Sequence, residues 1–386
     1  MSVIRYIGAI VLIAFSFMCI MPSNVNAEDT TFVSLSIQEA LDQAYKNNPE
    51  LRKAKLTVEQ SEIQKDDLAE MVYYIPGGGL ILPQVQQVVN NYQRAEIAWN
   101  TAKKSEKSAK DKVSMDVITA YNTATRKYND MENARIDLEK AKQQIRIRSL
   151  SNVLGLMNDF EYQQAKTGVQ QLEEQYKYSQ SQYEGAIASL RSLLGESESW
   201  QPVLSSKAIL KDYHREDLSL ELSRGISQSA QVWNAEAQMD MEKSREQWII
   251  PGISSEMQHI NTGLKEADYE QAKRDSKAQI QQLYYGIDSL VGQIAAGEKA
   301  YETAIKNSEI VELKYQLGLI PKCSIVPGGE SLSSVQITKK KARLDLENLQ
   351  AMLAQYKAQF AFLTGQKVYD SADWSEVNST QTTNVE

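Results

Sequence analysis

Histidine and cysteine, the residues most often used in metal sites and as catalytic bases and nucleophiles, are scarce in this sequence, with two of each. The two histidines, His214 and His259, lie far in sequence from Cys323 and from any spaced group of carboxylates. A zinc site or a Cys-His nucleophile needs such residues brought together in a fixed arrangement. Tertiary structure could still assemble them, but surface histidines and a cysteine in a turn are the simpler interpretation. We therefore expect no enzyme, and no catalytic, cofactor-binding or metal site.

Two short motifs could in principle bind anions. The stretch "YYIPGGGLILP", residues 73–83, is rich in glycine, but it lacks the Lys-Ser/Thr and the preceding strand of a phosphate-binding loop. The run "TKKKAR", residues 338–343, precedes Asp345 and Glu347 on a predicted helix. A basic run in that context usually forms a solvated helix face. Neither motif predicts a phosphate site.

The first residues predict that the protein is exported. Arg5, the apolar run 7–21 and "VNA" before Glu28 follow the order of a secretory signal peptide, which we assign to residues 1–27. An uncleaved anchor agrees less well, because a spanning helix takes about 20 apolar residues. Cys323 would then be the only cysteine, so no intramolecular disulfide could form. The formal net charge of −8 argues against a nucleic-acid partner.

The rest of the chain has the composition and spacing of long helices. Ser36 and Glu39 form a capping-box pattern, and Pro49 predicts the start of a second helix that ends near Met71. From residue 84 to residue 154 there is neither glycine nor proline, and apolar residues recur every seven positions: Val117, Ala124, Met131, Leu138 and Ile145. Four aromatic residues share this seam spacing and are expected in the core: Tyr121, Tyr128, Tyr356 and Phe360. Such a helix would be on the order of 100 Å long, so the molecule must be elongated.

The same order of elements then occurs a second time. A helix over residues 218–248 precedes Pro251, and a long segment over 263–317 breaks at "YQLGLIP", as the first long segment breaks at "SNVLGLM". Return helices end at Gly195 and at Gly365. This recurrence predicts a tandem duplication. The expected boundaries are a first repeat at 28–196, a linker at 197–216, a second repeat at 217–366 and a polar C-terminal tail at 367–386.

Taken together, these pieces resemble the outer-membrane efflux protein family, the TolC-like export ducts. The similarity rests on "LSIQEALDQAYKNNPELRKAK", the doubled hairpins, the two "LGL" turns, and the endings "SLRSLLGE" and "AFLTGQ". It implies an all-α fold of tandem-duplicated, long antiparallel coiled-coil hairpins with little or no β structure. In the family such chains form a homotrimer that encloses an α-helical barrel, and they meet a periplasmic adaptor protein and an inner-membrane pump.

The resemblance fails where the family inserts the strands of its membrane β-barrel. Those positions hold only "YYIPGGGLILP" and "WIIPGISSEMQHINTG", whereas one spanning strand takes about 9 to 11 residues. We expect the barrel strands to be missing or vestigial. The apolar side chains there either form a membrane-proximal patch that contacts a membrane surface or fill the gap between helix ends. They are Tyr73, Tyr74, Ile75, Leu80, Ile81, Leu82, Trp248, Ile249 and Ile250.

At the opposite end, the resemblance implies that two helical turns contact the adaptor or form a gate. The turn residues are Gly155 and Leu156 in the first repeat and Gly318 and Leu319 in the second. Acidic residues after the turn could form a ring in a trimer. Asp159 and Glu161 lie there in the first repeat, whereas the second repeat has Ser324 within "SIVPGGE", which looks like an insertion. A gate and ordinary solvated acids both fit this pattern.

The resemblance thus predicts a passive duct component of a tripartite efflux or type I export system, located in the outer membrane or the periplasm. A different class of function also fits, namely a non-conducting coiled-coil scaffold of the envelope derived from the same fold. The doubled hairpins and turns favour the duct, whereas the short strand positions favour the scaffold.

Overall fold

The computed structural model describes residues 32–73, 83–205, 217–247, 252–323 and 329–369. The first half of the chain forms β1 (Phe32–Leu35), α2 (Ile37–Asn47), α3 (Pro49–Tyr73), α4 (Pro83–Val153), α5 (Asp159–Leu194) and β2 (Gln201–Leu204). The second half forms α6 (Leu218–Gln228), α7 (Ala230–Glu246), α8 (Ser255–Gln316) and α9 (Leu332–Leu363). Strands β1 and β2 pair in parallel and are the only sheet of the described residues. The prediction of an all-α fold with little β structure is confirmed.

Local capping signals account for where several helices begin and end. The Ser36 side chain accepts a hydrogen bond from the Glu39 amide, and the Glu39 carboxylate accepts one from the Ser36 amide at 2.7 Å. This second bond lowers the pKa of Glu39. Helix α3 begins at Pro49, where proline forfeits only an amide that a first turn leaves unpaired. The predicted capping box and the break before Pro49 are both confirmed.

The single helix predicted over residues 218–248 is wrong, because the chain breaks there into α6 and α7. Ser229 lies at the break in an extended conformation, and its hydroxyl accepts a hydrogen bond from the Val232 amide. This cap stabilises the start of α7. The sequence has no proline there that would have predicted the break. The second half therefore has the same short helix and kink as the first half has at Asn48.

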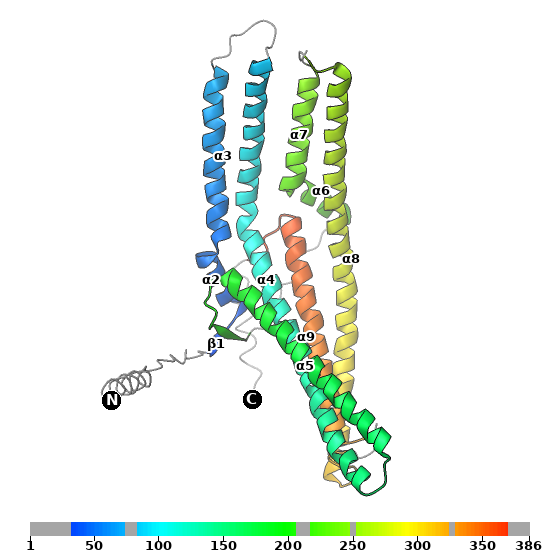
Figure 1. Cartoon of the computed structure of the whole chain (residues 1–386). Coiled ribbons are helices and arrows are strands. Elements are labelled where there is room, and N and C mark those ends of the chain that lie inside the picture. Colours follow the sequence, from blue (N-terminus) through cyan, green and yellow to red (C-terminus); the bar gives the residue numbers. More distant parts are fainter. Residues whose placement is uncertain (1–31, 74–82, 206–216, 248–251, 324–328, 370–386) are drawn as a thin grey trace, which may run out of the picture.

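The helices form an elongated, curved array (Figure 1). Helices α4 and α8 run along its whole length, with α3 and α7 beside their upper parts and α5 and α9 beside their lower parts. The contacts between helices give the order α3, α4, α7, α8 across the upper part and α5, α4, α9, α8 across the lower part. At 71 residues, α4 is on the order of 100 Å long, as its length at 1.5 Å per residue requires.

Two apolar clusters hold the middle of the array together. The larger one joins β1, α2, α4, α5 and the end of α9, and Tyr121 lies fully buried within it with its hydroxyl donating to the Leu35 carbonyl at 2.9 Å. Val368 also belongs to this cluster, so the chain still packs there beyond the end of α9. The smaller cluster joins α6, α8 and α9 around Ile280, Ile287 and Phe360. The expected packing of Phe360 in the core is confirmed.

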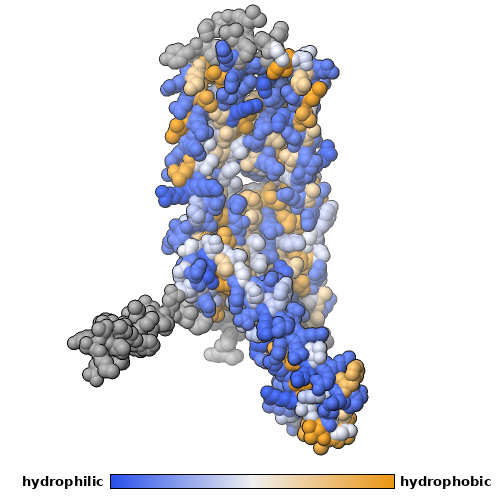
Figure 2. Space-filling view, viewed as in Figure 1, coloured by the Kyte–Doolittle hydropathy of each residue, from blue (hydrophilic) through white to orange (hydrophobic). Residues whose placement is uncertain are grey.

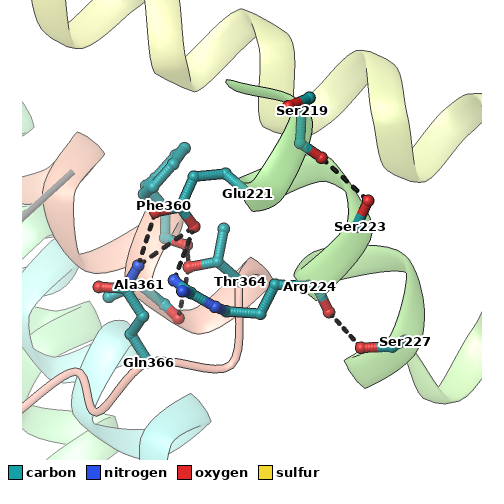
Figure 3. Close-up of polar contacts among 9 residues, drawn as sticks. All are labelled: Ser219, Glu221, Ser223, Arg224, Ser227, Phe360, Ala361, Thr364 and Gln366. Carbon is teal, nitrogen blue, oxygen red and sulfur yellow. Dashed lines mark hydrogen bonds and ion pairs between the residues drawn. The ribbon is translucent and has the colours of Figure 1, made fainter. Parts of the chain in front are cut away.

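A buried carboxylate fastens α6 to the chain that follows α9 (Figure 3). Glu221 is fully buried, pairs with Arg224 at 3.1 Å and accepts hydrogen bonds from the Gln366 amide at 3.3 Å. Thr364, also fully buried, donates to the Phe360 carbonyl at 2.8 Å. The bonds between Glu221 and Gln366 thus join α6, the first helix of the second half, to the residues that directly follow α9.

The two halves meet along a seam that is largely polar. In its lower part, Asn129 of α4 bonds Asn348 of α9 at 3.0 Å, and Lys341 of α9 pairs with Asp137 of α4 at 2.6 Å. Lys340 of α9 pairs with Glu132 of α4. The run "TKKKAR" is therefore not simply a solvated face, because two of its lysines join the halves. The sequence could not show this, since the acids lie more than 200 residues away.

None of the described helices combines the length and the hydropathy that crossing a bilayer would require.

Candidate functional site

The first of the two predicted turns joins α4 to α5 through a left-handed glycine. Gly155 has φ of 70°, and the Leu156 amide donates to the Ser151 carbonyl at 2.9 Å. This six-to-one hydrogen bond is the Schellman motif, for which glycine is the preferred residue. Asn158 then caps α5 by accepting a hydrogen bond from the Glu161 amide at 2.8 Å.

The second turn, after α8, has the same geometry. Gly318 has φ of 71°, and the Leu319 amide donates to the Lys314 carbonyl at 2.9 Å. The chain then takes a longer path before α9, during which the Leu332 amide donates to the Pro321 carbonyl at 3.3 Å and Lys314 pairs with Glu330 at 3.0 Å. The described residues between α8 and α9 thus contact both helices of the hairpin.

Both turns lie at the same end of the molecule (Figure 1), and hydrophobic surface is visible at that end in the space-filling view (Figure 2). In a Schellman motif the residue after the glycine commonly packs against its own helix. Leu156 and Leu319 are instead 78% and 70% exposed. Further apolar side chains near the two turns are also exposed: Leu150, Val153, Leu154, Phe160, Leu313 and Leu317. We call this set of leucines, Val153 and Phe160 the apolar tip.

Exposed apolar groups gathered in this way mark an interaction surface on soluble proteins. At the apolar tip the helical turns are fixed by backbone hydrogen bonds, so the side chains are presented without any need for the backbone to rearrange on binding. The arrangement suits the docking of an apolar partner surface and offers no chemistry for catalysis.

The predicted tip acids are both exposed. The Asp159 carboxylate accepts a hydrogen bond from the Asn152 side chain across the turn at 3.2 Å, while Glu161 lies in the first turn of α5. Acids in a first turn also interact favourably with the helix dipole. Both residues therefore have a local structural role, whatever they do in an assembly.

The predicted membrane-proximal patch lies almost wholly outside the described residues. Tyr73 is the last residue of α3, and its eight companions fall within 74–82 and 248–251. The helix ends that flank these stretches lie together at the end of the molecule opposite the apolar tip (Figure 1).

Of the side chains considered for catalysis, the structure describes His259 and Cys323, and it does not bring these two together. His259 bonds Glu246 at 2.8 Å, which lowers the pKa of that carboxyl, whereas His214 lies outside the described residues. Cys323 is exposed in the chain after α8. Within the part of the chain that the structure describes, no three histidine, cysteine or acidic side chains are placed to hold a metal ion.

One aromatic residue differs from its prediction. Tyr128 was expected in the core because of its heptad spacing, but it is 45% exposed and lines an open cleft against Tyr183 of α5. Tyr121, one heptad earlier, is buried because β1 and α2 cover it. The period of seven places both residues on similar faces of α4, but it does not say where a covering element ends.

Comparisons with known proteins agree with this geometry. The sequence matches no family model and no curated protein sequence. Its structure is similar to the outer-membrane channel OprN, with 12% identity over 86% of this chain and 90% of that chain and a TM-score of 0.59. It is also similar to the open state of the Neisseria gonorrhoeae MtrE outer membrane channel, with 13% identity over 86% of this chain and 89% of that chain and a TM-score of 0.58. For the Campylobacter jejuni CmeC outer membrane channel the identity is 12%, the coverage 91% and 90%, and the TM-score 0.56. The protein thus has the TolC-like fold that its motifs predicted.

Proposed function

We propose that the protein is a duct component of a tripartite efflux or type I export system, acting as a passive conduit in the cell envelope rather than as an enzyme. The observation that carries this proposal is the apolar tip, formed by two matched turns at one end of a TolC-like array of helices. A solvent-exposed set of leucines on a rigid turn is explained by a docking partner.

The edges of the array support assembly into a closed tube. Helix α8 forms one edge, where Ile260, Leu264 and Val291 are exposed, and helices α3 and α5 form the other, where Ile63 is exposed. Because the two edges are different surfaces, one edge of a copy would pack against the other edge of the next copy, and such contacts generate a ring when the rotation between copies closes. The resemblance to the efflux family implies that the ring has three copies.

The partners follow from the two ends of the tube. The apolar tip would contact a periplasmic adaptor protein, which would connect the duct to an inner-membrane pump. The opposite end would lie toward the outer membrane, with the predicted apolar patch at a membrane surface. Three copies of Asp159 and Glu161 would surround the entrance and make it acidic.

A scaffold without a conducting channel is the second candidate, and the opposite end of the molecule favours it. Only residues 74–82 separate α3 from α4, and only residues 247–254 separate α7 from α8. Few residues are therefore available to connect these helices.

Photocrosslinking at the apolar tip tests the proposal. A photoreactive residue at Leu156 or Leu319, introduced in cells of the source organism, should crosslink to an adaptor protein, and a residue at Leu220 of α6 should not. Leu220 is a matched control because it is 48% exposed and lies far from the tip. Crosslinking from Leu220 alone would contradict tip docking. Solute flux through purified oligomers placed between two compartments would then separate a duct from a scaffold.

A further inference from the structure

An open cleft lies between α5 and α9, beside strand β2 of the small sheet. It has a volume of about 680 Å³, within the range of small-molecule sites. Its walls come from α4, α5 and α9, and β2 closes it on one side. Both halves of the chain contribute to it, since α9 belongs to the second half and the other elements to the first.

Tyrosine rings form much of the cleft. Tyr128 of α4 and Tyr183 of α5 meet edge to face, with their centroids 5.6 Å apart and their planes at 63°. Tyr176 lies seven residues before Tyr183 on the same face of α5 and also lines the cleft. Tyr183 is half-buried, and this burial raises the pKa of its hydroxyl group. The hydroxyl is therefore neutral at ordinary pH. Flat apolar ring surfaces are thus available along α5.

Planar polar groups accompany these rings. The Gln180 amide bonds Glu184 at 3.0 Å, and Glu347 and Gln350 line the opposite wall on α9. The Nε atom of Arg191 is buried and has no hydrogen-bond partner within the described part of the chain. Because this atom is covered, a ligand would contact the other parts of the Arg191 side chain that line the cleft. Two carboxylates and one guanidinium give the cleft no strong charge preference.

The shape of the cleft favours a chain-like ligand. Its lining residues on α5 extend from Tyr176 to Arg191, which at 1.5 Å per residue is about 22 Å. An added β-strand is disfavoured. The Ser205 amide bonds the Leu35 carbonyl of β1, so the backbone groups of Pro202 and Leu204 point away from β1, and proline has no N–H to donate. The free edge of β2 is therefore a poor template for a peptide.

We propose that this cleft binds a neutral oligosaccharide. The apolar C–H faces of the sugar rings would stack on the tyrosines, and hydroxyl groups would bond the amides, carboxylates and guanidinium that line the walls. Tyrosine combines an apolar ring face with a polar hydroxyl group. The ring can contact the apolar face of a sugar, and the hydroxyl can bond the sugar's own hydroxyl groups. This inference does not rest on the duct proposal.

Binding of defined saccharides by the full-length protein tests the proposal. Linear tetrasaccharides of β-linked glucose, β-linked N-acetylglucosamine and β-linked mannose serve as probes, with affinity measured by calorimetry and contact measured by saturation-transfer NMR. We expect at least one of them to bind with a dissociation constant below millimolar. Failure of all three at millimolar concentration overturns the proposal, and so does an extended tetrapeptide that binds more tightly than any saccharide.

Variants on α5 then locate the site. Tyr176→Ala should weaken saccharide binding about tenfold or more, and Tyr183→Phe, which keeps the ring, should retain it. Tyr178→Ala is the matched control, because Tyr178 is 62% exposed on the same helix and does not line the cleft. The assignment is overturned if Tyr176→Ala and Tyr178→Ala lose the same amount of saccharide affinity while their melting temperatures stay unchanged. The saccharide would then bind elsewhere on the protein.

Discussion

At the scale of single residues, buried charges fix contacts that apolar periodicity does not specify. Glu132 of α4 accepts hydrogen bonds from Arg135 on its own helix and from Lys340 on α9. These bonds lower the pKa of Glu132 to about 2, with the bond from Arg135 as the largest cause. Because the Glu132 side chain is only 12% exposed, removing one of its partners would leave a largely buried charge less well compensated. We therefore expect the polar seam to be sensitive to pH and to single substitutions.

The pH dependence of Glu132 has a definite sign. Because its pKa is depressed from 4.5 in the folded state, its contribution is present above pH 4.5 and is lost as the pH falls toward about 2. Chemical denaturation of the wild type should therefore show a steeper loss of stability across this interval than Glu132→Gln. Identical slopes in the two proteins would show that Glu132 is not paired in solution.

Two glycines in helices should respond in opposite ways to alanine. A Cβ at Gly225 would lie 2.2 Å from the Ile280 Cδ1 atom and 3.0 Å from the Leu363 carbonyl oxygen, so Gly225→Ala should cost about 1 to 3 kcal/mol of stability through overpacking. A Cβ at Gly185 of α5 meets nothing within 4 Å. Gly185→Ala should stabilise the protein by about 0.5 to 1 kcal/mol. Thermal melting of both variants measures this, and a stabilising Gly225→Ala would contradict the packing of α6 against α8.

At the scale of elements, the long helices gain their stability from apolar seams within each hairpin. Leu138, predicted from the heptad, is 7% exposed, whereas Lys140 two residues later faces solvent. The register inferred for this part of α4 is therefore confirmed. Helix α4 thus makes apolar contacts within its own hairpin, whereas polar and charged side chains join it to α9.

Leu138→Asp should accordingly disrupt the pairing of α4. An unpaired carboxylate in a packed position costs about 3 kcal/mol or more, while Lys140→Asp on the exposed face should change stability by less than about 0.5 kcal/mol. Circular dichroism during urea denaturation compares the two. Equal midpoints would mean that the seam register is wrong.

At the scale of the whole molecule, the two edges of the array expose apolar side chains that would be unfavourable on a monomer in water. Ile260 and Leu264 of α8 are 49% and 60% exposed, and Ile63 of α3 is 61% exposed. Monomeric soluble proteins seldom leave extended apolar surface uncovered. Packing of the α8 edge against the α3 and α5 edge of another copy would cover these residues.

Charges on these two edges should therefore dissociate the oligomer. We expect wild-type protein to sediment as a trimer and Ile260→Glu or Ile63→Glu to sediment as smaller species with unchanged helix content. Leu220→Glu, on an exposed position of α6 away from both edges, provides the control. A wild-type monomer at micromolar concentration would refute the tube, and loss of assembly in the control would refute the assignment of the edges.

The sequence alone determined those features that depend on near neighbours. Capping residues Ser36 and Asn48, the left-handed glycines Gly155 and Gly318, and the heptad of α4 predicted the helices, the two turns and the buried register. Their order along the chain also resembles that of the TolC-like family, and this resemblance predicted the fold.

Only the tertiary structure decided what depends on contacts between distant parts of the chain. It paired Lys340 with Glu132 and buried Glu221 against Gln366. It also left Tyr128 in an open cleft although Tyr121, one heptad away, is covered by β1 and α2. Periodicity states which face of a helix a residue occupies, but which face is covered, and by what, depends on elements brought together from far along the chain.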